Sequence, residues 1–363
     1  MPPRKIVELL TPSPLRADPC CDHYDLDRCG GCQIQHLAYD AQLDAKGGII
    51  RDSITRIGRV PVDKPGVEAS GKQWRYRTKL TMKLRLVDGR WVAGLHRYDA
   101  PDEIFELRDC PITDESVLAS WRMVLEKQEL LPQAWELRAA VRVLSSGFAF
   151  TLEGGQDWPT HNEFFSSIDS MTELWWKPRG GSRRLLQSKT TDRAGASFTQ
   201  VNPGVAAQLR GWVLSLAGAM HPATAIDAFA GTGDLAAAMA ADGVRVTAIE
   251  IDRDAARLAA SRLPAGSRMI AARVEEALPG SLPADLLIVN PPRAGLDARI
   301  TDLLQSMAPG RGPRGIIYIS CNPATLGRDL QRMRSYRIRS LRGFDMFPQT
   351  AHVETVCELV PEA

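Results

Sequence analysis

The chain of 363 residues lacks a long hydrophobic run. No apolar stretch approaches the roughly 20 residues that a bilayer-spanning helix needs. Residues 1–14 contain only a short apolar patch broken by prolines, without the longer hydrophobic region of a signal peptide. We therefore expect neither a membrane protein nor an exported one, and we predict a cytoplasmic location.

The chain also lacks an excess of charge of one sign. Its 45 Lys and Arg residues nearly balance 43 Asp and Glu residues, for a formal net charge of +2. This net charge does not by itself indicate a nucleic-acid-binding protein, so any basic surface must be local. Internal repeats and low-complexity tracts are absent too. The hydrophobic share of 44% is enough for sizeable cores, and the length of 363 residues is enough for two or three domains.

The seven cysteines are unevenly placed. Cys29 and Cys32 enclose two glycines, which let the backbone fold tightly around a metal, and Cys21 lies eight positions before Cys29. In a cytosolic chain, such a cluster indicates a metal before a disulfide. With Cys110 as the fourth thiolate, the pattern predicts a four-cysteine site for iron–sulfur or zinc. Cys20 could replace Cys21 in this set.

Residues 74–87 alternate between apolar and basic side chains. Their period of two predicts a strand, and Asp88-Gly89 predicts a hairpin turn after it. One face of this strand carries five cations, which are Arg75, Arg77, Lys79, Lys83 and Arg85. Because like charges on one strand repel one another, we predict that this face contacts nucleic acid.

From Phe198 onward, apolar strand-like runs alternate regularly with amphipathic helical runs. The strand-like runs cover residues 224–230, 245–252, 267–274, 284–290 and 315–320. This order predicts an α/β fold with a doubly wound, largely parallel sheet. Before it, a helical run over 116–131 and a hairpin around Ser145-Ser146-Gly147 predict a smaller α+β domain.

A glycine-rich turn closes the first strand of this second half. Gly231 and Gly233 allow a ligand to approach the backbone at the mouth of a helix. Glu250 ends the next strand, where a carboxylate can accept two ribose hydroxyls. The pair predicts an adenosine-type cofactor and fits a dinucleotide equally well, although Ala236 replaces the third glycine of the dinucleotide fingerprint.

Cys321 follows the last apolar run directly and precedes Asn322-Pro323, a good helix start. Ligands of open α/β sheets bind at the carboxyl ends of the strands, and a helix N-terminus favours the thiolate form of a cysteine. The sequence therefore predicts a nucleophile at Cys321. Glu354 shares a strand face with His352 and provides an acid in the same domain.

Asn290-Pro291-Pro292 stands at another strand end. This motif suggests an enzyme that methylates exocyclic amines, in which an aromatic residue follows the two prolines. Arg293 takes that position here and speaks against such an enzyme.

Together, these motifs resemble the S-adenosylmethionine-dependent RNA uracil-5-methyltransferase family. The motifs that carry the resemblance are residues 198–204, 227–235, 289–297, 318–330 and 346–354, in family order. The Cys29–Cys32 motif with the later Cys110-Pro111-Ile112 resembles the iron–sulfur-containing members, such as 23S rRNA m5U methyltransferases.

The resemblance implies methyl transfer to C5 of a uridine, with Cys321 adding to C6 and Glu354 removing the C5 proton. The positions that match cofactor contacts are Gln200, Phe229, Asp234, Glu250 and Asn290. The positions that match ligands of a 4Fe–4S cluster are Cys21, Cys29, Cys32 and Cys110. Many relatives carry Asp at position 290, and a smaller polar residue is common at Arg273.

The implied organisation has three parts. We expect an N-terminal iron–sulfur segment over 1–70, a central α+β RNA-binding domain over 71–192 that contributes Cys110, and a Rossmann-like methyltransferase domain over 193–363. Many ribosomal-RNA members begin with a small β-barrel, and almost nothing precedes Cys20 here. We expect the protein to be a monomer that binds RNA, with 23S rRNA as the favoured substrate. The alternatives are the same chemistry on tRNA and methylation of an amine.

Overall fold

The computed structural model describes residues 10–190, 200–307 and 311–362 of the chain. The chain divides into two compact units. The first contains Met1–Gln42, Lys72–Ala196 and Pro348–Ala351, and the second contains Leu43–Gly71, Ser197–Phe347 and His352–Ala363. The boundary that the sequence suggested near residue 192 lies outside the described residues. In the described part of the chain, no helix is long and apolar enough to cross a membrane.

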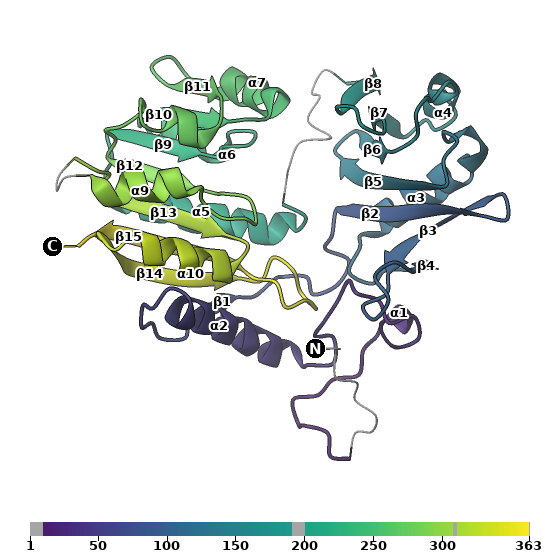
Figure 1. The fold of residues 1–363 in the computed structure, drawn as a ribbon, viewed down its shortest axis with the longest axis horizontal. Helices are drawn as coiled ribbons and strands as arrows, with labels where there is room; N and C mark the ends of the chain where they lie inside the picture. Colours follow the sequence, from purple (N-terminus) through teal and green to yellow (C-terminus); the bar gives the residue numbers. More distant parts are fainter. Residues whose placement is uncertain (1–9, 191–199, 308–310, 363) are drawn as a thin grey trace. The chain divides into compact units, whose positions relative to one another are not determined.

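The second unit is built on an eight-stranded sheet with the order β1-β14-β15-β13-β12-β9-β10-β11 (Figure 1). Its strands are β1 Val67–Glu68, β9 Thr224–Ala228, β10 Arg245–Glu250, β11 Arg268–Ala271, β12 Leu286–Val289, β13 Gly315–Ser320, β14 Tyr336–Phe344 and β15 Glu354–Pro361. Its helices are α2 Tyr39–Arg56, which begins in the first unit, α5 Pro203–Ala219, α6 Asp234–Ala241, α7 Arg253–Arg262, α8 Val274–Ala277, α9 Ala298–Ser306 and α10 Pro323–Arg332.

The predicted doubly wound α/β domain is confirmed. Strands β9 to β13 pair in parallel, and β15 pairs antiparallel with β13 and with β14. Helices cover both faces, because the apolar side chains of α2, α9 and α10 enter one core cluster and those of α5 and α6 enter another. The strand order reverses between β9 and β12, which places the switch point of the sheet there.

Residues 43–70, expected in an N-terminal iron–sulfur segment, belong to the second unit. Ile50 and Ile54 of α2 are fully buried in one of its cores, and Val67 of β1 pairs with Gly343 of β14. These contacts join residues far apart in the sequence, so local patterning could not reveal them.

The first unit contains a seven-stranded sheet with the order β4-β3-β2-β5-β6-β7-β8. Its strands are β2 Lys79–Val87, β3 Arg90–His96, β4 Ile104–Glu106, β5 Glu136–Leu144, β6 Gly147–Glu153, β7 Met171–Lys177 and β8 Arg184–Ser188. Its helices are α1 Asp22–Asp25, α3 Glu115–Leu125, the short 3-10 helix Gln128–Leu130 and α4 His161–Ser166. The predicted hairpin is the β5–β6 pair, closed between Leu144 and Gly147.

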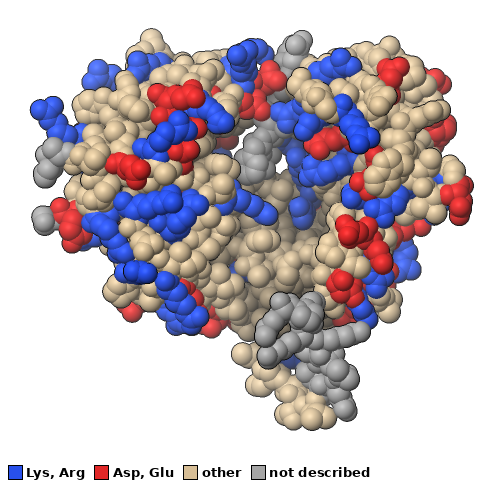
Figure 2. Space-filling model, viewed as in Figure 1, with Lys and Arg blue, Asp and Glu red and all other residues tan. Residues whose placement is uncertain are grey.

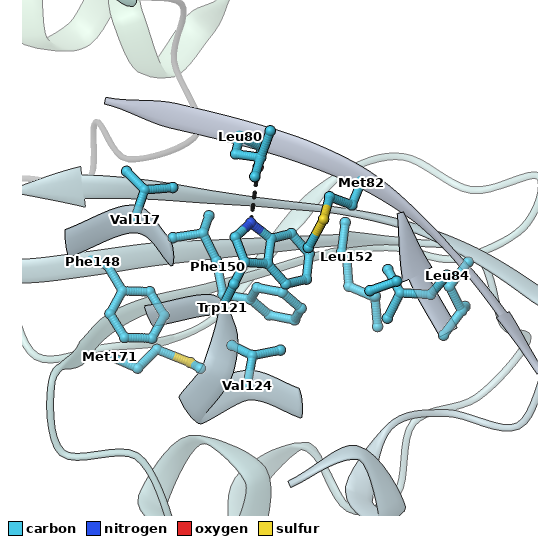
Figure 3. Packing of buried hydrophobic residues seen from close by; sticks show 14 of the residues in the cluster. Leu80, Met82, Leu84, Val117, Trp121, Val124, Phe148, Phe150, Leu152 and Met171 are labelled. Carbon is cyan, nitrogen blue, oxygen red and sulfur yellow. Dashed lines mark hydrogen bonds between the residues drawn. The ribbon is translucent and has the colours of Figure 1, made fainter. Parts of the chain in front are cut away.

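The inner face of this sheet packs on α3. Leu80, Met82 and Leu84 of β2 are buried, and Trp121 of α3 lies against them (Figure 3). The Trp121 indole Nε1–H donates to the backbone oxygen of Leu80 at 3.3 Å, so the inserted ring has its polar atom satisfied (Figure 3). The alternation predicted for β2 is therefore confirmed, and its basic side chains point away from this core.

Candidate functional site

The carboxyl edge of the parallel sheet gathers the predicted site residues of the second unit. Phe229 follows β9, Glu250 ends β10, Asn290 follows β12 and Cys321 follows β13. Because parallel strands end at the same edge, residues distant in sequence meet there, beside the switch point between β9 and β12. Asn290 is bonded into this edge through its backbone N–H, which donates to Ala228 O at 3.2 Å.

Cys321 and Glu354 are brought together by the antiparallel pairing of β13 with β15. The last register pair of the two strands is Ser320 with Thr355. Cys321 follows Ser320 and Glu354 precedes Thr355, so the two residues take opposite positions just beyond this pair. Neighbouring strands are about 4.8 Å apart, so the two side chains start from adjacent positions. Cys321 is half-buried, and the Glu354 side chain lies in the interior, with 2% of the residue exposed.

Burial raises the pKa of Glu354 to about 7, whereas the positive charge of Arg293 and a hydrogen bond from the Gln200 side chain act in the opposite direction. The carboxyl group therefore exchanges its proton near neutral pH, as a general base does. Gln200, predicted as a cofactor contact, thus lies at the acid in this structure. Residues 198–199 of the same motif lie outside the described residues.

The pKa of Cys321 is raised, first by burial and second by the charge of Glu354. These two effects oppose the thiolate form that the helix N-terminus is expected to favour. Arg293 lowers the pKa of the thiol, both by its charge and by a hydrogen bond to the sulfur. To act as a nucleophile, the Cys321 thiol would have to lose its proton, and the positive charge of Arg293 would stabilise the resulting anion.

Arg293 is the residue that sequence reasoning missed, since it served there only as an argument against an amine methyltransferase. Its side chain acts on both Cys321 and Glu354. Its backbone oxygen accepts hydrogen bonds from Asn322 Nδ2 and Thr325 Oγ1, each at 3.3 Å. The signal that could have found it is its position, four residues after the end of β12 at the ligand-binding edge.

A buried carboxylate holds this loop against α10. Oδ2 of Asp329 accepts from the Leu296 N–H at 2.8 Å and from the Tyr318 hydroxyl at 2.7 Å. Its Oδ1 accepts from the Arg328 guanidinium, whose Nη2 also donates to Ala294 O at 2.8 Å. The loop that carries Arg293 is thereby tied to β13 and α10, the elements that flank Cys321.

The glycine-rich turn after β9 is held by Glu250. Its carboxylate accepts the N–H of Gly231 and the N–H of Asp252, each at 2.8 Å. Phe229 adopts a left-handed backbone with φ of 64°, a strained conformation that is common where a chain closes around a ligand. Gly233 also has a positive φ of 76°, and a Cβ on it would lie 2.7 Å from Ala259 Cβ.

Three more charged side chains of this region have protein partners. Asp234 forms an ion pair with Arg262 at 2.8 Å, and Arg273 forms one with Glu275 at 3.4 Å. Asp227 is fully buried inside β9, where burial raises its pKa to about 7, and it accepts the Ala236 N–H at 3.1 Å. Asp227 therefore supports the start of α6, while Asp234 stays at the surface.

In the first unit, the predicted cysteines surround one cavity of about 310 Å³. Its lining includes Cys21, Cys29, Cys32 and Cys110. Cys20 is exposed and does not line it. Burial raises the pKa of Cys29 to about 11 and that of Cys32 to about 12. Across the described ranges, no three His, Cys, Asp or Glu side chains are close enough to hold a single metal ion.

The basic strand is shorter than predicted, because β2 begins at Lys79. Arg75 has a left-handed backbone with φ of 51°, which interrupts the extended run. Several of the five cations have acidic partners: Arg75 contacts Asp109 at 2.8 Å, and Glu136 contacts Lys83 at 3.0 Å and Arg85 at 2.9 Å. The expected uniform basic face is therefore partly neutralised within the protein.

Known proteins resemble the chain over nearly its whole length. The model of the family described as tRNA (Uracil-5-)-methyltransferase matches residues 271–360. An uncharacterized RNA methyltransferase of Protochlamydia amoebophila is 30% identical, over 98% of this chain and 86% of that protein. The 23S rRNA (uracil(1939)-C(5))-methyltransferase RlmD of Dichelobacter nodosus is 27% identical, over 96% and 85% of the two chains.

A solved structure shares the fold. It is the Pyrococcus abyssi tRNA (uracil-54, C5)-methyltransferase in complex with S-adenosyl-L-homocysteine. The TM-score is 0.67 at 23% identity, and the alignment covers 97% of this chain and 87% of that one.

Proposed function

Because the chain belongs to the S-adenosylmethionine-dependent RNA uracil-5-methyltransferase family, we propose that it methylates C5 of one uridine in 23S rRNA through covalent addition of Cys321 to C6. The observation that carries the mechanism is the register of β13 and β15, which sets Cys321 beside Glu354. A soft thiol and a carboxyl group with a pKa of about 7 are the two groups that this reaction needs.

The Cys321 thiol gives its proton to solvent and its sulfur forms a bond to C6 of the uracil, which moves the C5–C6 electron pair onto C5 and O4. C5 then takes the methyl group, and S-adenosylhomocysteine departs. Glu354 removes the remaining C5 proton, the C5–C6 double bond reforms and the sulfur of Cys321 leaves. The bound donor supplies the electrophilic methyl group, and all other groups come from this chain.

Arg293 is proposed to stabilise the anions of this sequence. Its guanidinium lowers the pKa of the Cys321 thiol and that of the Glu354 carboxyl group, so it favours the reactive form of each. Gln200 donates a hydrogen bond to Glu354 and so orients the acid. A preorganised positive charge at the reacting atoms is a strong source of rate enhancement in a site removed from water.

The glycine-rich turn and the end of β10 are proposed to hold S-adenosylmethionine. Glu250 already accepts two backbone N–H groups, and a carboxylate has further lone pairs for ribose hydroxyls. Gly231 leaves the backbone open to the ligand before α6, whereas Gly233 lets the turn pack closely on Ala259 of α7. Phe229 begins this turn directly after β9, Asn290 follows the neighbouring strand β12, and Asp234 lies at the first position of α6.

The 23S rRNA is preferred over tRNA because the named relative RlmD acts on that RNA and aligns over most of both chains. Transfer RNA is the second candidate, and it is supported by the description of the matched family model. An amine substrate is less well supported, since Arg293 occupies the place of the aromatic residue that would stack on it.

The cysteine cavity is proposed to hold a 4Fe–4S cluster on Cys21, Cys29, Cys32 and Cys110. All four ligands are thiols, which suits iron–sulfur and zinc alike. The four cysteines line one cavity of about 310 Å³, and Cys110 acts electrostatically on each of the other three thiols. Gly31 N–H donates to Cys29 Sγ at 3.3 Å, a bond that also stabilises a thiolate ligand.

The proposal is tested by incubating the purified protein with S-adenosylmethionine and transcripts of 23S rRNA or tRNA, followed by nucleoside mass spectrometry. We expect 5-methyluridine in the 23S rRNA transcript with the wild type and none with Cys321→Ala. The appearance of a methylated amine, or full activity in Cys321→Ala, would contradict the mechanism. Methylation of the tRNA transcript alone would change the proposed substrate from 23S rRNA to tRNA and leave the proposed mechanism unchanged.

A further inference from the structure

The second unit contains a fully buried ion pair between Lys46 of α2 and Asp345, the residue that follows β14. Figure 2 shows charged side chains spread over the visible face of the molecule, and the surface is where such side chains usually lie. Lys46 and Asp345 are exceptions, because the exposed fraction of each side chain is 0%. The Lys46 ammonium donates to the Asp345 carboxylate and, at 3.0 Å, to the backbone oxygen of Phe347. One cation therefore holds two points of the segment directly after β14.

This ion pair is a costly way to fill the interior. Burial lowers the pKa of Lys46, whereas the charge of Asp345 and the hydrogen bond to it act in the opposite direction. Two charges lose their hydration on burial, and apolar residues of similar volume at such places are often at least as stabilising. Stability alone therefore explains the pair poorly. A charge-assisted hydrogen bond does provide a fixed direction and distance between the atoms that it joins.

The ion pair lies next to the proposed base in the strand register. Phe344, the last residue of β14, is the register partner of Glu354, the first residue of β15. Asp345 follows Phe344 directly, and its backbone N–H donates to the backbone oxygen of Glu68 on β1 at 2.9 Å. The end of β14 is thus held by β1 and anchored to α2 by Lys46. Because Glu354 pairs with this strand end, a shift of Asp345 would displace the acid.

Residues 348–351 of the connection between β14 and β15 belong to the first unit, and polar contacts hold them there too. The Gln349 N–H donates to Gln42 Oε1 at 3.0 Å, and Gln42 Nε2 donates to Gln349 Oε1 at 2.9 Å. Both residues are buried, and Gln42 precedes Lys46 by about one turn of α2. Gln349 has a left-handed backbone with φ of 71°, a strained conformation that persists only where its surroundings hold it. Directional contacts thus fix the backbone of this connection.

We propose that Lys46 and Asp345 are positioning residues for Glu354, an inference that rests on the proposed function. The ion pair fixes the end of β14, and the β14–β15 register passes this position on to the acid that removes the C5 proton. Neither charge is among the groups that act most strongly on the pKa of Glu354, so the role is one of geometry. Removal of the C5 proton should therefore depend on the pair more than the earlier steps at Cys321 do.

The test separates proton removal from the steps before it. Lys46→Met/Asp345→Leu replaces both charges by apolar side chains, so that no single charge is left unpaired in the interior. We expect this variant to fold, to bind S-adenosylmethionine as the wild type does, and to release a methylated 23S rRNA transcript about tenfold more slowly, because a small displacement of a reacting group lowers the rate. Intact-mass analysis during turnover should show protein covalently bound to methylated RNA. A purely structural role would lower the melting temperature and leave this adduct at the wild-type level.

Lys64→Met/Asp44→Leu is the matched control. It removes another Lys–Asp pair that involves α2, but the side chains of this pair are 40% and 67% exposed. It should accumulate no more adduct than the wild type. Asp345→Asn keeps an oxygen acceptor for Lys46 and should accumulate less adduct than the apolar double variant and more than the wild type. If the double variant does not fold, the adduct level of Asp345→Asn decides by the same criterion.

The outcomes that would overturn the proposal differ from those that would overturn the proposed function. Adduct at the wild-type level in the folded Lys46→Met/Asp345→Leu variant would overturn the positioning role and leave the proposed function intact. Accumulation of unmethylated adduct would place the defect at methyl transfer and would also contradict a role that acts through Glu354. A wild type that forms no 5-methyluridine in either RNA would overturn both.

Discussion

Cys321 and Glu354 stand next to each other at the end of the parallel sheet because Ser320 of β13 pairs with Thr355 of β15. The pairing is antiparallel, so the chain leaves β13 through Cys321 at the same edge where it enters β15 through Glu354. Arg293 acts on both groups from the loop after β12. A thiol, an acid and a cation thus share one site whose geometry is set by strand register.

The pH dependence of methylation should report Glu354. Since its pKa is about 7 and the base must be ionised, we expect kcat/KM to rise as pH increases through about 7. Arg293→Met removes a charge that lowers the pKa of both reactive groups. The rise should then move to higher pH, and activity at pH 7 should fall at least about tenfold.

The control for this variant is Arg299→Met. Arg299 is exposed and pairs with Asp297 at 2.9 Å, and it is not one of the charged groups that act most strongly on the Cys321 thiol. Its pH profile should match the wild type. A normal profile in Arg293→Met would show that the cation has no role in the chemistry.

The buried acid should cost stability above neutral pH. The folded pKa of Glu354, about 7, exceeds the unfolded value of 4.5, so the native state binds more protons between these values and stability falls as pH rises through this window. Glu354→Gln should therefore raise the free energy of unfolding at pH 8, by about 3 kcal/mol at most. At pH 5 most of this gain should vanish. Denaturant titrations at both pH values provide the measurement, and a gain independent of pH would refute the assignment.

Gly233→Ala should impair cofactor binding and folding. The new Cβ would meet Ala259 Cβ at 2.7 Å and would force alanine into a positive φ. Backbone strain of about 1 kcal/mol and overpacking of about 1–3 kcal/mol should add. Gly243→Ala is the matched control, because its φ of 86° imposes similar strain while its Cβ would meet open space. Calorimetric titration with S-adenosylmethionine should show weaker binding in Gly233→Ala only.

The cysteine cavity should hold iron and inorganic sulfide in anaerobically purified protein. Cys21→Ser or Cys32→Ser should lose the brown colour and visible absorption, whereas Cys20→Ser should keep them because Cys20 lies outside the cavity. Metal analysis and absorption spectra provide the measurement. Stoichiometric zinc in a colourless protein would contradict the iron–sulfur cluster. Loss of colour in Cys20→Ser would show that Cys20 is a cluster ligand in place of Cys21.

The α/β half of the molecule was predictable because its patterns are local. Apolar runs and helix caps such as Asn202 and Asn322 marked its elements, and strand ends marked Cys321 and Glu250 as site residues. The alternation from Leu80 to Leu84 likewise predicted the inner face of β2 correctly.

What the sequence could not reveal depends on contacts between distant residues. The burial of Ile50 and Ile54 in the second unit needs the sheet to be present. The raised pKa of Cys321 arises from burial and from Glu354, neither of which is visible in the local motif. The ion pair of Lys46 with Asp345 joins residues far apart in the sequence, which no local pattern specifies.

The most direct test of the central claim is intact-mass analysis of Glu354→Gln after incubation with RNA and S-adenosylmethionine. If Glu354 removes the C5 proton, this variant should accumulate protein covalently bound to methylated RNA, with the link at Cys321 after digestion. Glu358→Gln, a buried acid on the same strand, should release methylated RNA as the wild type does. Free 5-methyluridine-containing RNA from Glu354→Gln at the wild-type rate, or a link to another residue, would contradict the mechanism.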